Sequence, residues 1–286
     1  FAGPARYDRI VQLIEELPKA TAADMEVIHG DVVSLLAPSI VSALTTHVTR
    51  FAHPLGQWLV DQLREWDCAL SEESVEASIY SVIRRRWTES VGERLGIATP
   101  ELGGPKWPSP ESASRMLYEA AMHLLVDGNW HLVPGLESED DLDSALSACI
   151  DETLEELEQR LGEDNSQWTW GRLHRMASPH PLASAVEQAR HLHPPIDSCP
   201  GDSDTVRRGE VVPETGERSA TASVARYVFD LDDWDRSGWV VPHGVSGVRG
   251  EGHDMDQRAA WLNCTLIPMA FTASAVEQVA AEYFEI

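Results

Sequence analysis

The sequence predicts an α+β fold, with a helix-rich first two-thirds and a strand-containing C-terminal end. Apolar residues recur at helical spacing, with capping signals between them, up to about residue 165. From residue 166 onward, segments rich in Trp, Pro and Gly break this periodicity, and alternating strand patterns follow. We therefore distinguish a helical region, 1–165, from a loop-rich and strand-containing region, 166–286, and do not expect them to be independent domains.

The first helical signals lie at the N-terminal end of the chain. An apolar stripe at helical spacing ends at Pro18, and it consists of Ile10, Leu13, Ile14 and Leu17. Thr21 followed by Asp24 is typical of a capping box. We expect this box to open a longer helix that runs through Leu36 and breaks near Pro38.

Three further helices are expected before residue 166. One opens at Ser71-Glu72-Glu73, and another at Ser109-Pro110-Glu111, where proline suits the first helical position. The second of these should stop at Asp127-Gly128. A capping box at Ser138 to Asp141 should open the third, which ends at Gly162.

The C-terminal region reads as a long ordered loop over 193–221, followed by two strands and a helix. Ser223–Leu231 has the alternation of a half-buried strand, and its apolar set is Ala225, Tyr227, Phe229 and Leu231. Gly238–Pro242 is the second strand candidate. A capping box at Ser274 to Glu277 should open the last helix.

Composition limits the classes of partner. The formal net charge is -25, which argues against nucleic acid, since phosphate binding needs a positive surface. No apolar run is long enough to cross a bilayer, so we expect no membrane partner. The 286 residues suffice for a sizeable core.

Residue chemistry alone identifies no catalytic site. The sequence contains no G-x-S-x-G elbow, phosphate loop or dinucleotide fingerprint after a strand. A histidine cluster could hold zinc and activate water, although its spacing fits no known zinc motif and favours the anchoring of a loop; it consists of His174, His180, His191 and His193. The cysteines allow two disulfides or four buried thiols, and they are Cys68, Cys149, Cys199 and Cys264.

Short motifs along nearly the whole chain resemble those of one enzyme family. They are Arg6…Arg9-Ile10, His29-Gly30-Asp31…Ser34, Trp66-Asp67, Trp168-Thr169-Trp170-Gly171…His174…His180-Pro181-Leu182, Gly201-Asp202-Ser203-Asp204-Thr205-Val206, Arg226–Leu231, and Ser246-Gly247…His253…Asp256-Gln257…Trp261. Their order and spacing are similar to the C-terminal part of the β chain in the penicillin acylase (penicillin amidase) family of N-terminal nucleophile hydrolases. One departure is His29, which stands where the family commonly has glutamine.

This resemblance implies a fold and a reaction. The family fold is a four-layer αββα sandwich, and a precursor cuts itself into an α and a β chain. The N-terminal serine of the β chain is the nucleophile, its α-amino group is the base, and a backbone amide and an asparagine hold the oxyanion. These parts lie upstream of the matched segment, and Phe1 has no hydroxyl or thiol. We therefore expect a fragment of an amide-bond acylase that is inactive alone; the alternative is a non-catalytic scaffold or binding domain.

The resemblance carries few site residues into this chain. Arg6 matches an arginine near the nucleophile, where it acts as an auxiliary, electrostatic catalytic residue, and a salt bridge at an interface is the alternative. His180, Asp204 and Asp256 are expected to satisfy backbone groups of long loops. We assign no substrate-binding residue, metal ligand or cofactor; the resemblance allows calcium in the full-length enzyme. It also implies the rest of the precursor and a small N-acylated substrate as partners, and a periplasmic or secreted location.

Overall fold

The structure is a computed structural model of the whole chain, and it describes residues 4–97, 110–176, 180–211, 218–219 and 222–280. It is helix-rich with two small sheets, which confirms the α+β prediction. The α-helices are α1 (Ala5–Glu15), α2 (Ala22–His29), α3 (Ala37–His47), α4 (Gly56–Glu65), α5 (Val75–Arg94), α6 (Pro110–Val126), α7 (Glu139–Leu161), α8 (Trp170–Leu173), α9 (Pro181–Ala185), α10 (Arg258–Leu262) and α11 (Ala273–Val279). No helix of this part of the chain combines the length and apolarity that crossing a bilayer requires.

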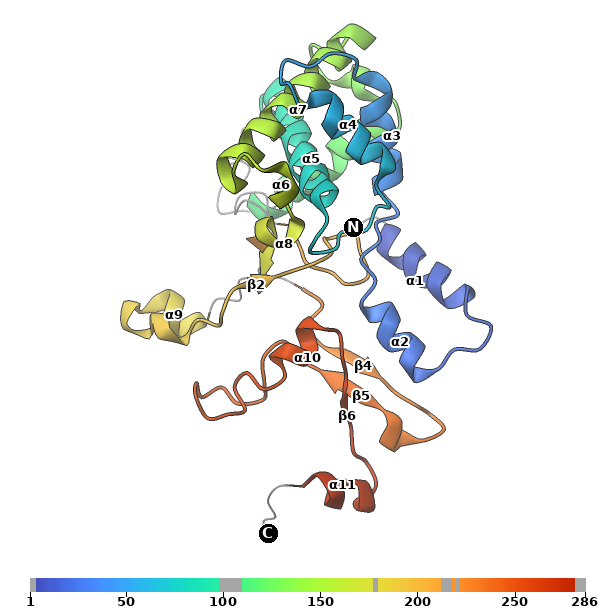
Figure 1. Cartoon of the computed structure of the whole chain (residues 1–286), viewed down its shortest axis with the longest axis vertical. Helices are drawn as coiled ribbons and strands as arrows, with labels where there is room; N and C mark the ends of the chain where they lie inside the picture. The colour runs from blue at the N-terminus through green and yellow to red at the C-terminus, as the bar shows by residue number, and fades with distance from the viewer. Residues whose placement is uncertain (1–3, 98–109, 177–179, 212–217, 220–221, 281–286) are drawn as a thin grey trace.

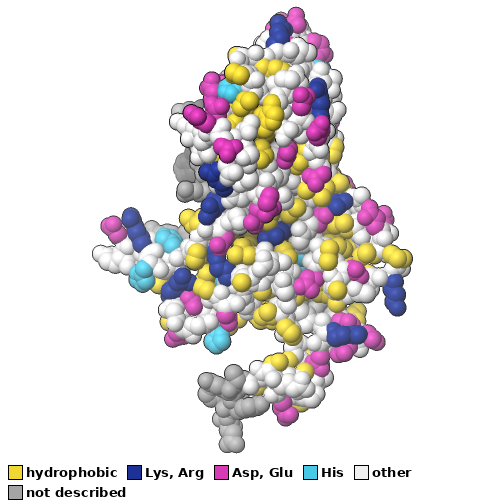
Figure 2. All heavy atoms as spheres, in the orientation of Figure 1, with side chains coloured by type: hydrophobic (Ala, Val, Ile, Leu, Met, Phe, Trp, Pro, Cys, Tyr) yellow, Lys and Arg dark blue, Asp and Glu magenta, His cyan; other side chains and the backbone are white. Residues whose placement is uncertain are grey.

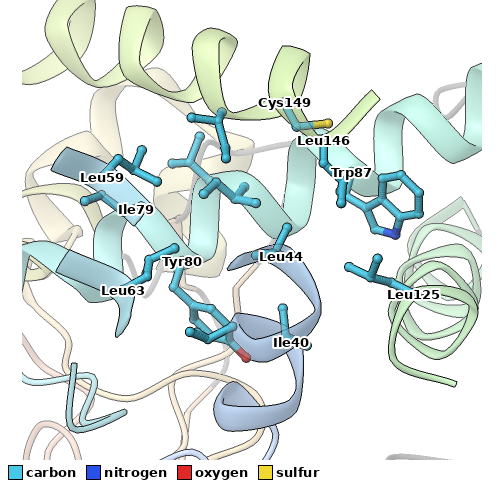
Figure 3. Close-up of a cluster of buried hydrophobic side chains, with 14 of the residues drawn as sticks. Ile40, Leu44, Leu59, Leu63, Ile79, Tyr80, Trp87, Leu125, Leu146 and Cys149 are labelled. Atoms are coloured by element: carbon cyan, nitrogen blue, oxygen red, sulfur yellow. The ribbon is translucent and has the colours of Figure 1, made fainter. Parts of the chain in front are cut away.

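Helices α3 to α8 form a bundle, and α1 and α2 lie outside it beside the strands (Figure 1). Helix α5 is central, because it contacts α4, α6, α7 and α8 and is buried on most sides. Its apolar side chains meet those of the neighbouring helices in the larger of two cores (Figure 3). Trp87 is 1% exposed, and its indole Nε1 donates to the Ala121 carbonyl oxygen at 2.8 Å, so the polar atom of this core residue is also satisfied.

Local capping signals place several helix ends correctly. Thr21 and Asp24 form the expected capping box, and so do Ser138 and Asp141. Helix α7 ends at Gly162 with a φ of 97°, a conformation that favours glycine. Helix α6 begins at Pro110 and ends just before Asp127-Gly128 as expected, and Ser109 lies outside the described residues.

The expected continuous helix from Thr21 through Leu36 is wrong. Helix α2 ends at His29, and Val33 then pairs with Ala69 in an isolated bridge. Ser34 Oγ accepts a hydrogen bond from the Ala37 amide at 3.2 Å, and helix α3 begins at Ala37 with Pro38 in its first turn. A contact with a remote segment therefore interrupts a pattern that is locally helical.

Two other helix starts are corrected by their caps. Helix α5 begins at Val75 rather than near Ser71, because the Ser74 side chain accepts from the Ala77 amide at 3.0 Å. Helix α11 begins after Thr272, whose hydroxyl accepts from the Ala275 amide, so the predicted box at Ser274 is wrong.

The strands form two three-stranded sheets below the bundle (Figure 1). In the first sheet, β1 (Arg175–Met176) pairs antiparallel with β2 (Asp197–Ser198) and parallel with β3 (Arg218–Ser219). In the second, β4 (Arg226–Val228), β5 (Gly238–Val240) and β6 (Ile267–Pro268) are antiparallel. The segment 193–221, expected as loop, thus contributes β2 and β3, and Gly238–Val240 confirms the second strand candidate.

Strand β4 of the second sheet buries the opposite face from the one that the sequence predicts. It is only three residues long, and Arg226 and Val228 are 4% and 7% exposed, whereas Tyr227 is 43% exposed. Phe229 and Leu231, from the same apolar set, are also exposed. The smaller core includes Met176, Val240 and Trp261, and the Arg226 guanidinium lies over the Trp261 ring.

The four cysteines are free thiols, which decides between the two alternatives left open by the sequence. Cys68 is half-buried, and the other three are buried. Burial raises the pKa of the Cys149 thiol to about 12 and that of the Cys199 thiol to about 11. These thiols are therefore protonated at neutral pH.

Candidate functional site

The motif Gly201–Val206 folds into a tight loop held by its own side chains. The Asp202 carboxylate accepts from the Asp204 amide at 2.7 Å, and Thr205 Oγ1 accepts from the Asp202 amide at 3.0 Å. The Thr205 hydroxyl also lies 2.8 Å from the Arg207 carbonyl oxygen, to which it donates. Gly201 has a φ of 76°, and an added Cβ would lie 2.0 Å from that same oxygen, so only glycine fits.

A buried ion cluster joins this loop to the centre of the bundle. Arg84 of α5 is 2% exposed and contacts the Asp202 carboxylate at 2.8 Å and that of Asp204 at 3.4 Å. Its guanidinium carbon lies 4.0 Å from the centroid of the Tyr80 ring and 5.4 Å from that of Tyr118. Charge as well as packing therefore holds the loop against the central helix α5.

The two carboxylates of the cluster differ in environment. Burial, and then the negative charge of Asp202, raise the pKa of Asp204 to about 6, although Arg84 lowers it. Burial also raises the pKa of the Tyr80 hydroxyl, which stays neutral. The expectation that Asp204 satisfies loop amides is corrected here, because the carboxylate that accepts a loop amide is that of Asp202.

Hydrogen bonds to and from its backbone attach the same loop to three other segments. Trp170 Nε1 donates to the Gly201 carbonyl oxygen at 3.0 Å, and the Gly201 amide donates to that of Leu70 at 2.8 Å. The Arg207 amide donates to the Asp31 carbonyl oxygen at 2.8 Å. Motifs that lie far apart in the sequence thus meet around one loop.

Arg6, the predicted site residue, lies at the end of this loop. Its Nε and Nη2 atoms donate to the Val206 carbonyl oxygen at 3.2 and 3.1 Å. Burial and the charge of Arg208 lower the pKa of Arg6, which stays charged at neutral pH. Among the described residues Arg6 forms no ion pair, so its charge is not neutralised here. Its auxiliary role stays a prediction.

The second arginine of the same motif fixes the position of α1. Arg9 makes a two-point contact with the Asp31 carboxylate, at 3.1 Å from Nε and 2.8 Å from Nη2. This hydrogen bonding raises the pKa of Arg9. Because Arg9 is one turn from Arg6, this ion pair holds the helix that presents Arg6 to the loop.

The predicted histidine cluster does not assemble as one site. His174 is buried and stacks on Trp170 with 4.4 Å between ring centroids. His180 lies elsewhere, where its Nδ1 accepts from the Leu182 amide and its own amide donates to His193 Nδ1. This confirms that His180 satisfies backbone groups. Within the described residues, no three His, Cys, Asp or Glu side chains gather in a metal-binding arrangement.

Asp256 lies in the C-terminal region and contacts a side chain. Its carboxylate is 2.8 Å from His253 Nδ1, and both side chains are at least one-third exposed. The neighbouring Gln257 Oε1, rather than Asp256, accepts from the Val241 amide at 3.0 Å. The expectation that Asp256 holds loop amides is thus corrected in favour of Gln257.

Sequence reasoning missed Arg84, which is central to the cluster. A signal was present, since Arg84 follows Tyr80 by four residues and precedes Trp87 by three, on the buried side of α5. The burial of Arg226 was missed as well, because the sequence placed Arg226 on the polar face of its strand and that face is the buried one.

The comparisons with known proteins agree with the motifs. The sequence model of the penicillin amidase family matches residues 1–278. The chain is 31% identical to penicillin acylase 2 proenzyme of Pseudomonas sp. (strain SE83) over 98% of its own length and 34% of that protein. It is 24% identical to acyl-homoserine lactone acylase QuiP of Pseudomonas putida over 90% of its length and 33% of that protein. The chain thus spans about a third of these relatives, and it belongs to the penicillin amidase family.

Proposed function

We propose that this chain is the C-terminal part of the β chain of an acylase that hydrolyses an N-acyl amide. The nucleophile would be the N-terminal serine of the complete β chain, which forms an acyl-enzyme that water resolves. The observation that carries this proposal is the match of almost the whole chain to about a third of a penicillin acylase proenzyme. The fixed position of Arg6 at the Gly201–Val206 loop supports it.

In this proposal Arg6 acts on the reaction through its charge. A serine α-amino group titrates near neutrality, so it can accept the hydroxyl proton without a histidine. A nearby guanidinium lowers the proton affinity of that amine and favours negative charge on the oxyanion. The two hydrogen bonds to Val206 hold the Arg6 side chain in place before substrate binds, so no reorganisation is required during the reaction.

Replacing Arg6 with methionine is expected to lower kcat/KM of the full-length enzyme by about 100-fold, the loss that follows removal of one stabilising group at an oxyanion. Without the cation the serine amine binds its proton more tightly. The acid limb of the pH profile of kcat/KM should therefore move to higher pH. Hydrolysis of a chromogenic acyl-amide across a pH series measures both effects.

Two comparisons test this assignment. Arg6→Lys keeps the charge and should retain the pH profile, while Arg64→Met removes an exposed arginine of α4 and should change neither measurement. A normal pH profile in a mature, folded Arg6→Met enzyme contradicts the role. If the full-length protein matures but forms no acyl-enzyme detectable by mass spectrometry, the alternative of a non-catalytic scaffold is favoured.

The exposed face of the second sheet suggests where the rest of the precursor binds. Tyr227 stacks on Phe229 and on Trp239, with ring centroids 5.9 and 6.3 Å apart. Phe229 is 55% exposed and Tyr227 is 43% exposed, which is unusual for neighbouring aromatics. Hydrophobic side chains also reach the surface at several places around the strands in Figure 2. We propose that upstream strands cover this face and complete the αββα sandwich.

A charge on this face should prevent assembly. Phe229→Asp in the full-length precursor is expected to reduce the yield of mature enzyme by about tenfold or more, because an unpaired carboxylate would be buried at the contact. Val248→Asp is a matched control, since Val248 is also 55% exposed. Equal yields of mature enzyme from the two variants, measured by gel electrophoresis, would show that the face stays open to solvent.

We further propose a small N-acylated substrate, such as a penicillin, a cephalosporin derivative or an acyl-homoserine lactone. The names of the two relatives support this class. A periplasmic or secreted location and calcium bound by the upstream part of the enzyme belong to the same proposal. Hydrolysis of these three substrates by the full-length enzyme, compared through kcat/KM, identifies the preferred acyl group.

A further inference from the structure

Two arginines near the second sheet bind backbone carbonyl oxygens. The Arg226 guanidinium donates to the Trp261 carbonyl oxygen, and that of Arg207 donates to the Leu262 carbonyl oxygen. In the part of the chain that the structure describes, neither guanidinium forms an ion pair. This is unexpected in a chain with 47 acidic and 22 basic residues.

Arg226 is the most buried of these cations. The residue is 4% exposed, and its Nε atom is buried without a hydrogen-bond partner among the described residues. Its guanidinium carbon lies 4.7 Å from the centroid of the Trp261 ring, which compensates part of the charge. Burial, and more weakly the charge of Arg207, lower the pKa of Arg226. A buried positive charge with an unused donor is costly, and a bound anion would reduce this cost.

His29 presents a second unused nitrogen from the neighbouring helix. Helix α2 packs against β4, and within the described parts of the chain His29 Nδ1 is buried without a hydrogen-bond partner. Burial and the charges of Arg226 and Arg6 lower the pKa of His29, although Glu26 raises it, so the imidazole is neutral at pH 7. The Glu26 carboxylate already accepts from the Leu266 amide at 2.8 Å.

We propose that His29 and Arg226 form a binding site for a carboxylate, which accepts hydrogen bonds from His29 Nδ1 and Arg226 Nε. A carboxylate fits because it has two oxygens that can accept from the two unused donors, which lie on the packed elements α2 and β4, and because its charge balances the guanidinium. A water molecule would satisfy the donors but would leave the charge uncompensated. The carboxylate comes either from a small free acid or from an Asp or Glu in the rest of the protein.

Acetate is the probe for a free acid, added to the protein at its natural length and at constant ionic strength. The midpoint of thermal unfolding should rise saturably with acetate. Affinity should fall about tenfold or more in Arg226→Met and in His29→Leu, which each remove a donor. His29→Gln restores an N–H donor and should bind within about twofold of the wild type, as should the control Arg190→Met, whose side chain is 72% exposed.

A carboxylate from the protein itself gives a different result. Acetate then has no effect, and a crystal structure of the full-length protein shows an Asp or Glu oxygen within hydrogen-bond distance of Arg226 Nε. Either result supports the site. The proposal is overturned if that structure shows only water at Arg226 Nε and acetate has no effect, or if His29→Leu binds acetate as well as the wild type. The His29 pair keeps the test valid if Arg226→Met does not fold.

Discussion

Replacing Arg84 with methionine is expected to lower the free energy of unfolding by about 3–5 kcal/mol, the cost of breaking a buried ion pair from one side. Methionine fills much of the volume but leaves the Asp202 carboxylate, which is 1% exposed, without its cation. The Gly201–Val206 loop should loosen as a result. Because Arg6 is bound to this loop through Val206, maturation and activity should fall together with stability.

Chemical denaturation of Arg84→Met, with urea as denaturant, measures the loss. Arg64→Met is the control, because its exposed ion pair with Asp61 should contribute less than about 1 kcal/mol. The double variant Arg84→Met, Asp202→Asn should lose less than the sum of the single variants, since the unpaired charge is gone. Additive losses, or a loss below about 1 kcal/mol for Arg84→Met, would contradict the cluster as a source of stability.

Replacing Asp204 with asparagine is expected to raise the free energy of unfolding above pH 6, which is the opposite of the effect of Arg84→Met. The pKa of Asp204 is raised from 3.8 to about 6, so between these pH values the folded state holds a proton that the unfolded state has released. Stability therefore falls as the pH rises from about 4 to about 6 and stays lower above that window. Asparagine carries no charge and removes this loss.

The size of the effect follows from the same linkage. A pKa that moves from 3.8 to about 6 corresponds to about 3 kcal/mol. Since the Asp204 side chain is 21% exposed, solvent screening reduces the expected gain at pH 7.5 to about 1–3 kcal/mol. Thermal unfolding of the wild type and Asp204→Asn at a series of pH values measures the gain and the flattened pH dependence.

The other carboxylate of the cluster serves as the comparison. Asp202→Asn should destabilise the protein at pH 7.5, because Asp202 is fully buried and makes the shorter contact with Arg84. Asp232→Asn, at an exposed position, should change little. If Asp204→Asn is as destabilising as Asp202→Asn, then Asp204 is an ordinary ion-pair partner and its raised pKa has no effect on stability.

Sequence alone determined several features whose hydrogen bonds close within a few residues. The capping boxes at Thr21 and Ser138 and the helix end at Gly162 are of this kind, because donor, acceptor and backbone conformation lie within one turn. Motif order across the chain also identified the family. These results required no knowledge of which segments meet in space.

Only the tertiary structure decided which polar groups are buried and which apolar groups stay exposed. Arg84 is buried because Asp202, 118 residues later, brings it a carboxylate. The segment after His29 leaves the helix because it pairs with residue 69, and β4 turns Arg226 inward over the ring of Trp261. Local patterns record the polarity of a side chain, whereas burial of a charge depends on partners that the fold brings from elsewhere in the sequence.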